Sequence, residues 1–367
     1  MTSNKQPGQA QREPAEVVYR KELQKLVAMD EGPVPPGWQL SPRSVARFLL
    51  GDAVAGIERK FVADPEVVNR IIISLCTSRG SLLVGEPGTA KSWLSELLAA
   101  AISGSSTLVV QGGSVSDVRQ LLYGWNEAIL RAEGPVREAL VPSPLLRGMM
   151  EGRLVRFEEL ARCPQTLQDA LLSVLSDRVV SIPELPGEEG IILARQGFNL
   201  IATTNSVDAG VHQMSAALKR RMDFEQIRPI SRLEDELEVV GRELEKLNRD
   251  SGVKTEMPPE VLEILVTVFH ELRNGQTMDG RSTDRLAGSA LSTAEAVSVA
   301  HAASLGAWYL GDGKVTVTLL LRHLVGAVLK DKPEDRRRLR HYFDTAVAPR
   351  KGAHWQAARE LQGLIGT

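Results

Sequence analysis

The chain has 367 residues, of which 43% are hydrophobic and 25% charged, and its formal net charge is -2. That charge argues against a protein that coats nucleic acid through bulk electrostatics, and two isolated cysteines, Cys76 and Cys163, provide neither a disulfide framework nor a zinc pattern. No stretch approaches the roughly 20 apolar residues that cross a bilayer, and the N-terminus has no apolar signal-peptide core. We therefore expect a reduced, cytoplasmic setting.

Residues 1–40 are predicted to form a partly disordered N-terminal extension. Met1 to Glu16 is rich in Gln, Pro, Lys and Glu, a composition typical of a disordered leader. Val17 to Met29 has the apolar spacing of a helix, and the run from Gly32 to Gly37 predicts a loop. The next helix is expected at Ser41-Pro42, because serine can cap it and proline can occupy its first position.

Short apolar segments alternate with helical ones over the next part of the chain. A helix is expected from Asp64-Pro65 to about Ser78. The segments with the composition of strands are Ser81–Val84, Thr107–Val110, Leu154–Phe157, Asn199–Ala202 and Phe224–Ile227. Short apolar strands separated by helices predict a parallel sheet covered on both faces. We expect this α/β domain to span residues 41–230.

No strand-like run follows Ser231. The segments with helical spacing are Leu233–Leu247, Pro259–Leu272, Arg285–Leu305 and Thr316–Leu329. From Arg336 the chain is basic and helical, and it ends in the segment from Trp355 to Leu364. The sequence therefore predicts an all-α domain over residues 231–335 and a basic helical tail over residues 336–367.

The segment between the first strand and the next helix nearly matches the phosphate-binding pattern G-x-x-x-x-G-K-S/T. Its residues, together with the one that follows, are Gly85, Glu86, Pro87, Gly88, Thr89, Ala90, Lys91, Ser92 and Trp93. The glycines let backbone N–H groups converge on the β-phosphate, and the positive end of the helix points at the same place. Lys91 would reach the β- and γ-phosphates of ATP, and the Ser92 hydroxyl would ligate magnesium. Ala90 stands where the pattern has its second glycine, and we expect no positive φ there because the start of a helix tolerates the methyl group.

A second element has to hold magnesium and activate water. The strand at Leu154–Phe157 ends in two acids, Glu158 and Glu159. Ligands bind at the carboxyl ends of strands in open α/β sheets, so these acids are expected beside the phosphate loop. We predict that Glu158 contacts the magnesium shell and that Glu159 polarises the attacking water. An ordinary solvated acidic pair is the alternative, and the phosphate loop upstream argues against it.

Four motifs follow one another in an order that makes a family resemblance specific. The runs GEPGTAKS, RFEEL, IATTN and LKRRMDFE succeed one another as in AAA+ ATPases, and within that superfamily the chain resembles the MoxR type. The resemblance covers roughly Val54 to Lys330 and implies an AAA+ P-loop fold followed by an all-α lid domain. MoxR-type loops commonly carry alanine before the lysine, as Ala90 does here.

The resemblance also assigns roles to three polar residues after the acids. Asn205 is similar to the sensor-1 residue that orients water or contacts the γ-phosphate. Arg220 and Arg221 resemble the arginine finger that reaches the γ-phosphate of a neighbouring subunit, and a guanidinium suits the charge of a transferring phosphoryl group. A basic helix end that complements the helix dipole is the alternative for each arginine.

A further arginine of the helical half resembles the sensor-2 residue of the lid. Ser282 can cap the next helix and would place Arg285 in its first turn. The family pattern puts this arginine about one residue closer to the serine, so Arg281 remains a competitor. A surface arginine pair is the alternative for both.

The chain departs from the family pattern at the first acid, where aspartate is usual and Glu158 stands here. The extra methylene lengthens the side chain by about one carbon–carbon bond and changes its reach to magnesium. A nucleotide-gated scaffold that binds ATP and hydrolyses it weakly therefore remains an alternative function.

Two longer connections fit the MoxR subgroup. Tyr123 to Gly148 resembles the helix-2 insert, and Val179 to Gln196 resembles the hairpin before sensor 1. The resemblance implies that both contact a substrate, and ordinary surface loops are the alternative.

By resemblance, the protein is expected to be a hexameric ring ATPase that remodels or matures a protein client, with a partner that bears a von Willebrand factor A domain. A nucleic-acid motor is the rival, supported by the basic run Arg336 to His341, which has little aromatic interleaving and is more typical of a solvated helix face. A GTPase would need Asn-Lys-x-Asp after a strand, and the Asn-Lys of this chain is Asn4-Lys5. A small-molecule kinase would leave the helical half and the arginine pair unexplained.

Overall fold

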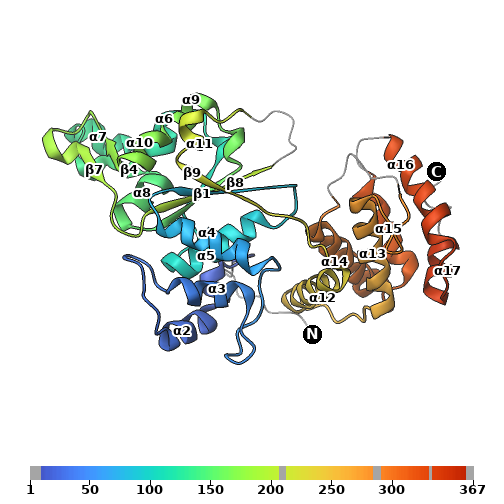
Figure 1. The fold of residues 1–367 in the computed structure, drawn as a ribbon. Helices are drawn as coiled ribbons and strands as arrows, with labels where there is room; N and C mark the ends of the chain where they lie inside the picture. The colour runs from blue at the N-terminus through green and yellow to red at the C-terminus, as the bar shows by residue number, and fades with distance from the viewer. Residues whose placement is uncertain (1–9, 206–211, 284–290, 330–332, 361–367) are drawn as a thin grey trace. The chain divides into compact units, whose positions relative to one another are not determined.

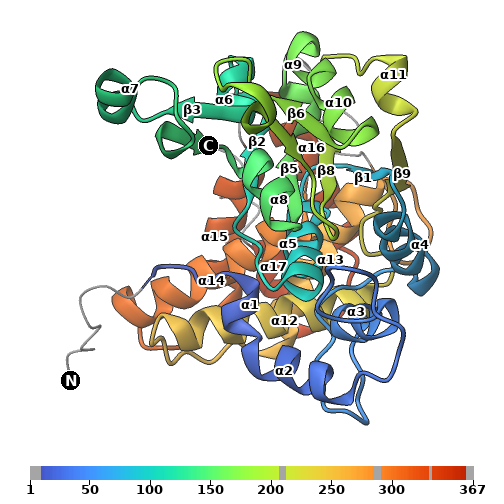
Figure 2. The same cartoon turned by 90° about the vertical axis from the view of Figure 1, so that its left-hand side faces the viewer.

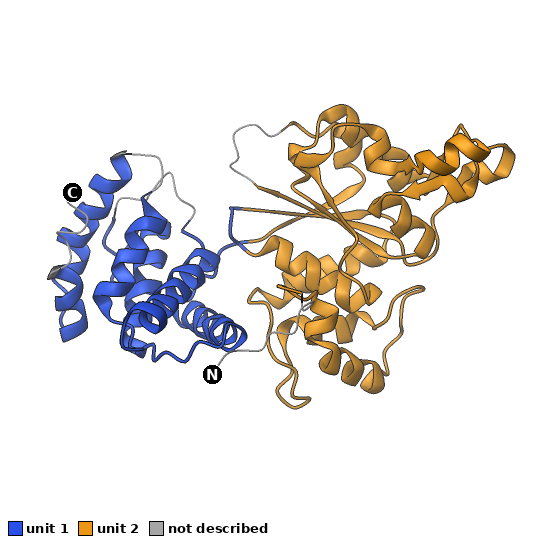
Figure 3. Ribbon diagram, turned by 180° about the vertical axis from the view of Figure 1, so that it is seen from behind, with its two compact units in different colours: residues 1–6, 86–89, 228–367 blue, residues 7–85, 90–227 orange. Residues whose placement is uncertain are grey.

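The computed structural model describes residues 10–205, 212–283, 291–329 and 333–360 (Figure 1). Contacts divide the described chain into two units (Figure 3). The α/β unit contains residues up to 85 together with residues 90–227, and the helical unit contains residues 86–89 and those from 228 onward. The sequence suggests four segments, and the structure has two units. The described N-terminal residues, from Ala10 onward, belong to the α/β unit, and the basic tail belongs to the helical unit.

Five parallel strands form the sheet of the α/β unit, in the order β2-β5-β8-β1-β9. They are β1 (Gly80–Gly85), β2 (Val109–Gln111), β5 (Leu154–Glu158), β8 (Asn199–Asn205) and β9 (Met222–Gln226). Each strand predicted from the sequence is confirmed, with its ends moved by no more than three residues. The expected parallel sheet is therefore confirmed.

Successive side chains of each strand point to opposite faces of this sheet, and each face has its own apolar core. Leu82, Val155 and Leu200 belong to one core, whereas Leu83 and Ile201 belong to the other. Helices cover both faces, as a fully buried parallel sheet requires. The helices in the first core are α6 (Val118–Leu122), α8 (Pro144–Glu151), α9 (Gln165–Asp169), α10 (Leu171–Ser176) and α11 (Ala216–Lys219).

The second core lies beneath the N-terminal helices and the helix after the phosphate loop. These helices are α1 (Ala15–Val18), α2 (Arg20–Met29), α3 (Pro42–Leu50), α4 (Pro65–Cys76) and α5 (Lys91–Ser103). As predicted, the Ser41 hydroxyl caps α3 by accepting from Ser44 N–H. The helix predicted for Val17 to Met29 is instead broken at Tyr19 into α1 and α2.

The prediction of a disordered leader up to Glu16 is wrong at its C-terminal end. Ala15 is fully buried, and the Glu16 carboxylate accepts hydrogen bonds from Ser106 N–H at 3.1 Å and from its hydroxyl at 2.6 Å. Helix α1 packs against α5 (Figure 2). A polar composition does not prevent order here, because this short segment finds partners on a preformed surface.

Both connections that were expected to be inserts contain antiparallel hairpins. In the first, β3 (Tyr123–Trp125) pairs with β4 (Leu140–Pro142) around α7 (Glu127–Glu133), a helix with no buried residue (Figure 2). In the second, β6 (Val179–Ser181) pairs with β7 (Ile191–Leu193). The Tyr123 hydroxyl donates to the Glu184 carboxylate at 2.8 Å and joins the two inserts.

One apolar core holds the helical unit together. Its helices are α12 (Leu233–Asp250), α13 (Pro259–Asn274), α14 (Thr293–Leu310), α15 (Val317–Val328), α16 (Pro333–Tyr342) and α17 (Ala353–Glu360), with a π-helical turn at Phe343–Val347. The start of the helix predicted from Arg285 lies outside the described residues, and α14 begins at Thr293 with a capping box between Ser292 and Glu295. Within the described ranges, no helix combines the length and the apolar character needed to cross a bilayer.

Candidate nucleotide-binding site

The predicted phosphate loop connects the carboxyl end of β1 to the first turn of α5. Gly85 is the last residue of β1 and pairs with Asn205 at the end of β8. The loop is closed by a turn, in which the Thr89 hydroxyl donates to the Glu86 carbonyl at 2.9 Å. The Lys91 ammonium, 7% exposed, donates to the Gly85 carbonyl at 3.1 Å. A triphosphate at this turn would therefore meet the N-terminus of a 13-residue helix and an ammonium already directed at the loop.

The expectation for Ala90 is wrong. Ala90 has φ 60° and ψ 27°, the left-handed conformation in which the phosphate-loop pattern places glycine. A non-glycine residue pays about 1 kcal/mol or more for this conformation. The methyl group is therefore tolerated at a cost in strain, and the backbone of the loop keeps the shape that a glycine would allow.

Glu158, at the end of β5, is 4% exposed, and each oxygen of its carboxylate is hydrogen-bonded twice. Its Oε2 accepts from the hydroxyls of Ser92 at 2.6 Å and Thr203 at 2.7 Å. Its Oε1 accepts from the Ser95 hydroxyl at 2.7 Å and from Arg156 Nη2 at 3.1 Å. Burial alone would raise the pKa of Glu158, but the three hydroxyl donors and the charge of Arg156 outweigh it and hold the pKa below its usual value. Glu158 is therefore an ionised, fixed carboxylate.

The residues predicted to hold magnesium are brought together. The Ser92 hydroxyl and the Glu158 carboxylate are in direct contact, and they supply only oxygen donors, which magnesium prefers. Since the Ser92 hydroxyl donates its proton to Glu158, its lone pairs are the part left for a cation. The side chain of Glu158 reaches α5 from β5. This donor set fits a magnesium ion that Ser92 and Glu158 would hold.

Glu159 lies next to this pair in a different environment. Its φ is 56°, again left-handed, and its N–H donates to the Thr203 hydroxyl at 3.1 Å. The side chain is 42% exposed and lies 3.4 Å from Arg162. The two acids are thus divided into a buried, immobilised carboxylate and an accessible one. Strained backbone of this kind is concentrated at functional sites, and two of the three non-glycine residues with positive φ in the described chain are Ala90 and Glu159.

The arginine pair lies at the opposite end of the sheet from the phosphate loop. Arg221 immediately precedes β9, and its carbonyl accepts from Gly80 N–H at the start of β1. From Gly80 to Gly85 the strand covers about 16 Å. The Arg221 guanidinium donates to the Ser176 hydroxyl and to the Ala217 carbonyl, whereas Arg220 is exposed. The fold therefore keeps both arginines away from the phosphate loop of their own subunit.

The two sensor-2 candidates differ in how far the structure describes them. Arg281 lies on a turn of the helical unit, where it is half-exposed and bound to Asp279 at 2.9 Å. Ser282 pairs with Gln276 in an isolated bridge, so the described part of the chain gives it no role as a helix cap. Arg285 lies outside the described residues.

Trp93 turns its ring toward the N-terminal segment. The ring centroid is 6.2 Å from that of Tyr19, and the Arg12 guanidinium lies 5.9 Å above the ring. Trp93 was grouped with the phosphate-loop residues from the sequence. Since its ring contacts the N-terminal segment, we expect only its backbone, at the start of α5, to take part in nucleotide binding.

Three residues of the site were missed from the sequence: Ser95, Arg156 and Thr203. Thr203 joins the two acids, because its hydroxyl donates to Glu158 and accepts from Glu159 N–H. Arg156 is only 8% exposed in the middle of an otherwise apolar strand. A charged residue at a buried strand position has to be paired. The arginine in Leu-Val-Arg-Phe-Glu could therefore have indicated a buried ion pair at the site.

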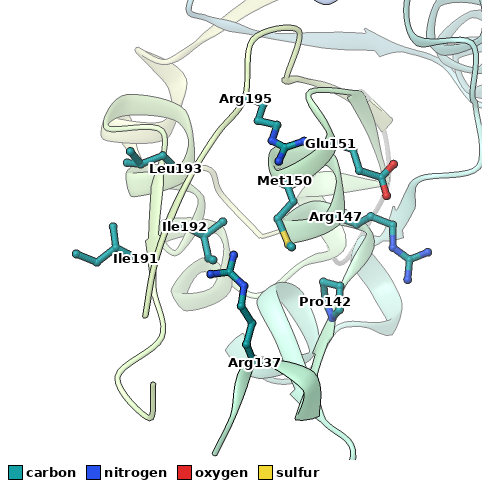
Figure 4. Close-up of a pocket in the computed structure, with 9 residues that line it drawn as sticks. All are labelled: Arg137, Pro142, Arg147, Met150, Glu151, Ile191, Ile192, Leu193 and Arg195. Carbon is teal, nitrogen blue, oxygen red and sulfur yellow. The ribbon is translucent and has the colours of Figure 1, made fainter. Parts of the chain in front are cut away.

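A surface pocket of about 430 Å³ lies between the two inserts and α8 (Figure 4). It is lined by Arg137, Pro142, Arg147, Met150, Glu151, Ile191, Ile192, Leu193 and Arg195. Ile191 and Leu193 are 52% and 66% exposed. The single carboxylate, Glu151, is paired with Arg153 at 3.1 Å, while the three lining arginines have no ion-pair partner among the described residues. The pocket therefore combines uncompensated positive charge with exposed aliphatic surface.

Known proteins resemble both parts of the chain. Residues 80–222 match the AAA domain (dynein-related subfamily), and residues 234–365 match the YehL-like AAA+ ATPase C-terminal domain. The chain is 51% identical over 348 residues to the protein YehL of Escherichia coli (strain K12), covering 95% of each chain. It is 29% identical over 151 residues to the gas vesicle ATPase GvpN1 of Halobacterium salinarum, covering 40% of this chain and 39% of that protein. Among solved structures, NtrX from Brucella abortus in complex with ADP has a TM-score of 0.51 at 15% identity, over 84% of this chain and 70% of that one, which is a likeness of fold.

Proposed function

Because the chain belongs to the family of YehL-like AAA+ ATPases, we propose that it binds ATP with magnesium and hydrolyses it, in a ring whose activity remodels or matures a protein partner. The observation that carries the proposal is the contact of Ser92 in the phosphate-loop helix with Glu158, beside an accessible Glu159. Within AAA+ proteins we place it in the MoxR-type group, on the motif order and on the two hairpin inserts.

The proposed chemistry divides the work among residues of this chain. Lys91 and the backbone of the loop bind the β- and γ-phosphates, and Ser92 with Glu158 holds magnesium, which would neutralise charge on the phosphates. Glu159 accepts a proton from the attacking water, since its carboxylate is accessible and that of Glu158 is already hydrogen-bonded on both oxygens. We propose that Asn205 orients that water, and its position at the end of β8 opposite Gly85 supports this role.

We propose that Arg221 completes the site of a neighbouring subunit. Its position at the amino end of β9, about 16 Å along the sheet from its own phosphate loop, supports action in trans. A guanidinium delivered by a neighbour would stabilise charge on the transferring phosphoryl group. We propose that the subunits assemble as a ring, of six subunits as in the MoxR-type group, in which each finger reaches a neighbouring site.

Mixing two inactive variants tests the action in trans. Glu159→Gln lacks the base but keeps the finger, and Arg221→Ala lacks the finger but keeps the base. We expect each alone to hydrolyse ATP at least about 100-fold more slowly than the wild type, and their mixture to recover a measurable fraction of activity. The ATPase rate is measured at a series of protein concentrations, and specific activity should fall on dilution. Lys219→Ala, at an exposed lysine of α11, serves as the matched control. A mixture no faster than its components would contradict the proposal.

We propose that the pocket between the inserts binds the protein client. The client would supply acidic and aliphatic groups to it. The charge of Arg137, Arg147 and Arg195 and the exposed Ile191 and Leu193 support this chemistry. A von Willebrand factor A domain protein is the partner class that the MoxR-type resemblance suggests.

Charge reversal in the pocket tests the client contact. In the Glu159→Gln background with ATP, the partner that co-purifies with the protein should be lost when Arg147 and Arg195 are both replaced by glutamate. Yield should fall by about tenfold at low salt, since like charges then face an acidic partner, and by less at high salt, where the repulsion is screened. Arg43→Glu, at an exposed arginine on α3, is the control. Undiminished recovery of the partner, or recovery of nucleic acid in its place, would contradict this part of the proposal.

A further inference from the structure

A chain of alternating charges joins the N-terminal segment to the proposed magnesium site. It runs from Arg12 to Glu96 at 2.7 Å, from Glu96 to Arg156 at 3.6 Å, and from Arg156 to Glu158 at 3.1 Å. Glu96, Arg156 and Glu158 are 5%, 8% and 4% exposed, whereas the Arg12 side chain is 71% exposed. A surface arginine is thus connected to the buried carboxylate through two buried ion pairs.

Arg156 is the centre of this chain, and its guanidinium is bonded on every nitrogen. Its Nε donates to the Ser95 hydroxyl at 2.9 Å and Nη1 donates to the Ser106 carbonyl at 3.1 Å. Nη2 donates both to the Ser92 carbonyl at 2.9 Å and to Glu158. The planar fork therefore holds strand β5, the first turn of α5 and the connection after α5 in one geometry. Those are the elements that carry Glu158 and Ser92.

The N-terminal segment reaches Arg156 by a second route as well. The Glu16 carboxylate binds both the N–H and the hydroxyl of Ser106, whose carbonyl accepts from Arg156. Arg12 and Glu16 therefore bracket the same guanidinium, one through Glu96 and the other through Ser106. Neither of these two contacts involves Lys91 or the turn from Glu86 to Thr89, so we expect their main effect on the side that would hold magnesium.

We propose that Arg156 is a positioning residue that fixes Glu158 against Ser92 for magnesium, and that the segment from Arg12 to Glu16 is part of the same positioning unit. This rests on the proposed function of the site. Removing Arg156 would leave Glu96 paired with Arg12 alone and would take from the buried Glu158 its ion-pair partner and one of the two donors to its Oε1. Removing Arg12 would free Glu96 to draw Arg156 away from Glu158. The N-terminal segment would then set how strongly magnesium supports nucleotide binding.

Binding of a fluorescent ATP analogue, mant-ATP, measures how strongly magnesium supports nucleotide binding, without turnover. Each variant is made in the Glu159→Gln background and titrated with mant-ATP in EDTA and at increasing magnesium chloride. Arg156→Met should raise the magnesium concentration at which the enhancement of mant-ATP binding is half-maximal by about 10- to 100-fold, the range for residues that orient metal ligands. Arg12→Ala and Glu16→Gln should raise it by about two- to fivefold, as expected for partly exposed ion pairs. Affinity in EDTA should change less than about twofold in each.

The controls separate positioning from folding and from the function itself. Arg20→Ala removes an exposed arginine of α2 outside the network and should match the parent. If Arg156→Met unfolds, Arg156→Lys retains the charge without the fork and should give an intermediate magnesium requirement. Arg12 is exposed, so Arg12→Ala should leave the protein folded and tests the contribution of the segment from Arg12 to Glu16. An unchanged magnesium requirement in Arg12→Ala and in the folded Arg156 variant would overturn the inference. Failure of the parent to bind mant-ATP would instead overturn the proposed function.

Discussion

Replacing Glu159 with glutamine is expected to lower the rate of ATP hydrolysis by about two to four orders of magnitude and to leave ATP binding intact. Glu159 is the accessible acid of the pair, with its N–H held by Thr203 and its carboxylate 42% exposed. Glutamine keeps the size and the hydrogen-bonding capacity of the side chain but cannot take a proton from water. The phosphate-binding residues are not changed, so bound ATP should accumulate.

Steady-state phosphate release measures the rate of hydrolysis, and mant-ATP titration measures nucleotide binding. Glu133→Gln, on the exposed helix α7, is the matched control and should hydrolyse ATP like the wild type. Hydrolysis that survives in Glu159→Gln would show that another group is the base. A wild type that binds ATP and hydrolyses it no faster than Glu159→Gln would support the alternative of a nucleotide-gated scaffold.

Replacing Lys91 with alanine should weaken ATP binding by about two orders of magnitude or more, since charge-assisted hydrogen bonds to the β- and γ-phosphates are lost together. The ammonium is nearly buried and already directed at the loop through the Gly85 carbonyl. Its loss removes the only positive side-chain charge that the loop pattern offers to the phosphates, so hydrolysis should fall because nucleotide is absent.

Mant-ATP titration distinguishes this effect from that of Glu159→Gln, which keeps its ligand. Lys219→Ala, at an exposed lysine of α11, is the control and should bind like the wild type. Since the Lys91 side chain is packed, circular dichroism and thermal unfolding should show that the variant is folded. Wild-type affinity in a folded Lys91→Ala would remove the phosphate loop from the proposed site.

Local patterns determined much of the fold and of the site. The glycine-bearing loop, the strand that ends in two acids and the cap at Ser41 each depend on a few neighbouring residues, whose backbone preferences are short-range. The disorder predicted for Glu16 was wrong for the complementary reason, because Glu16 is ordered by Ser106, a residue 90 positions away.

The sequence by itself determined that a phosphate loop precedes a helix, that acids follow a buried strand, and that an all-helical part comes after the sheet. Only the tertiary structure decided that Ala90 adopts a left-handed backbone, that Glu158 is immobilised while Glu159 is accessible, and that Arg221 stands at the far end of the sheet. It also made Arg156 the centre of an ion network that extends to Arg12. The physical reason is that hydrogen bonding and burial of a charged side chain depend on groups brought together from distant parts of the chain, which no local pattern specifies.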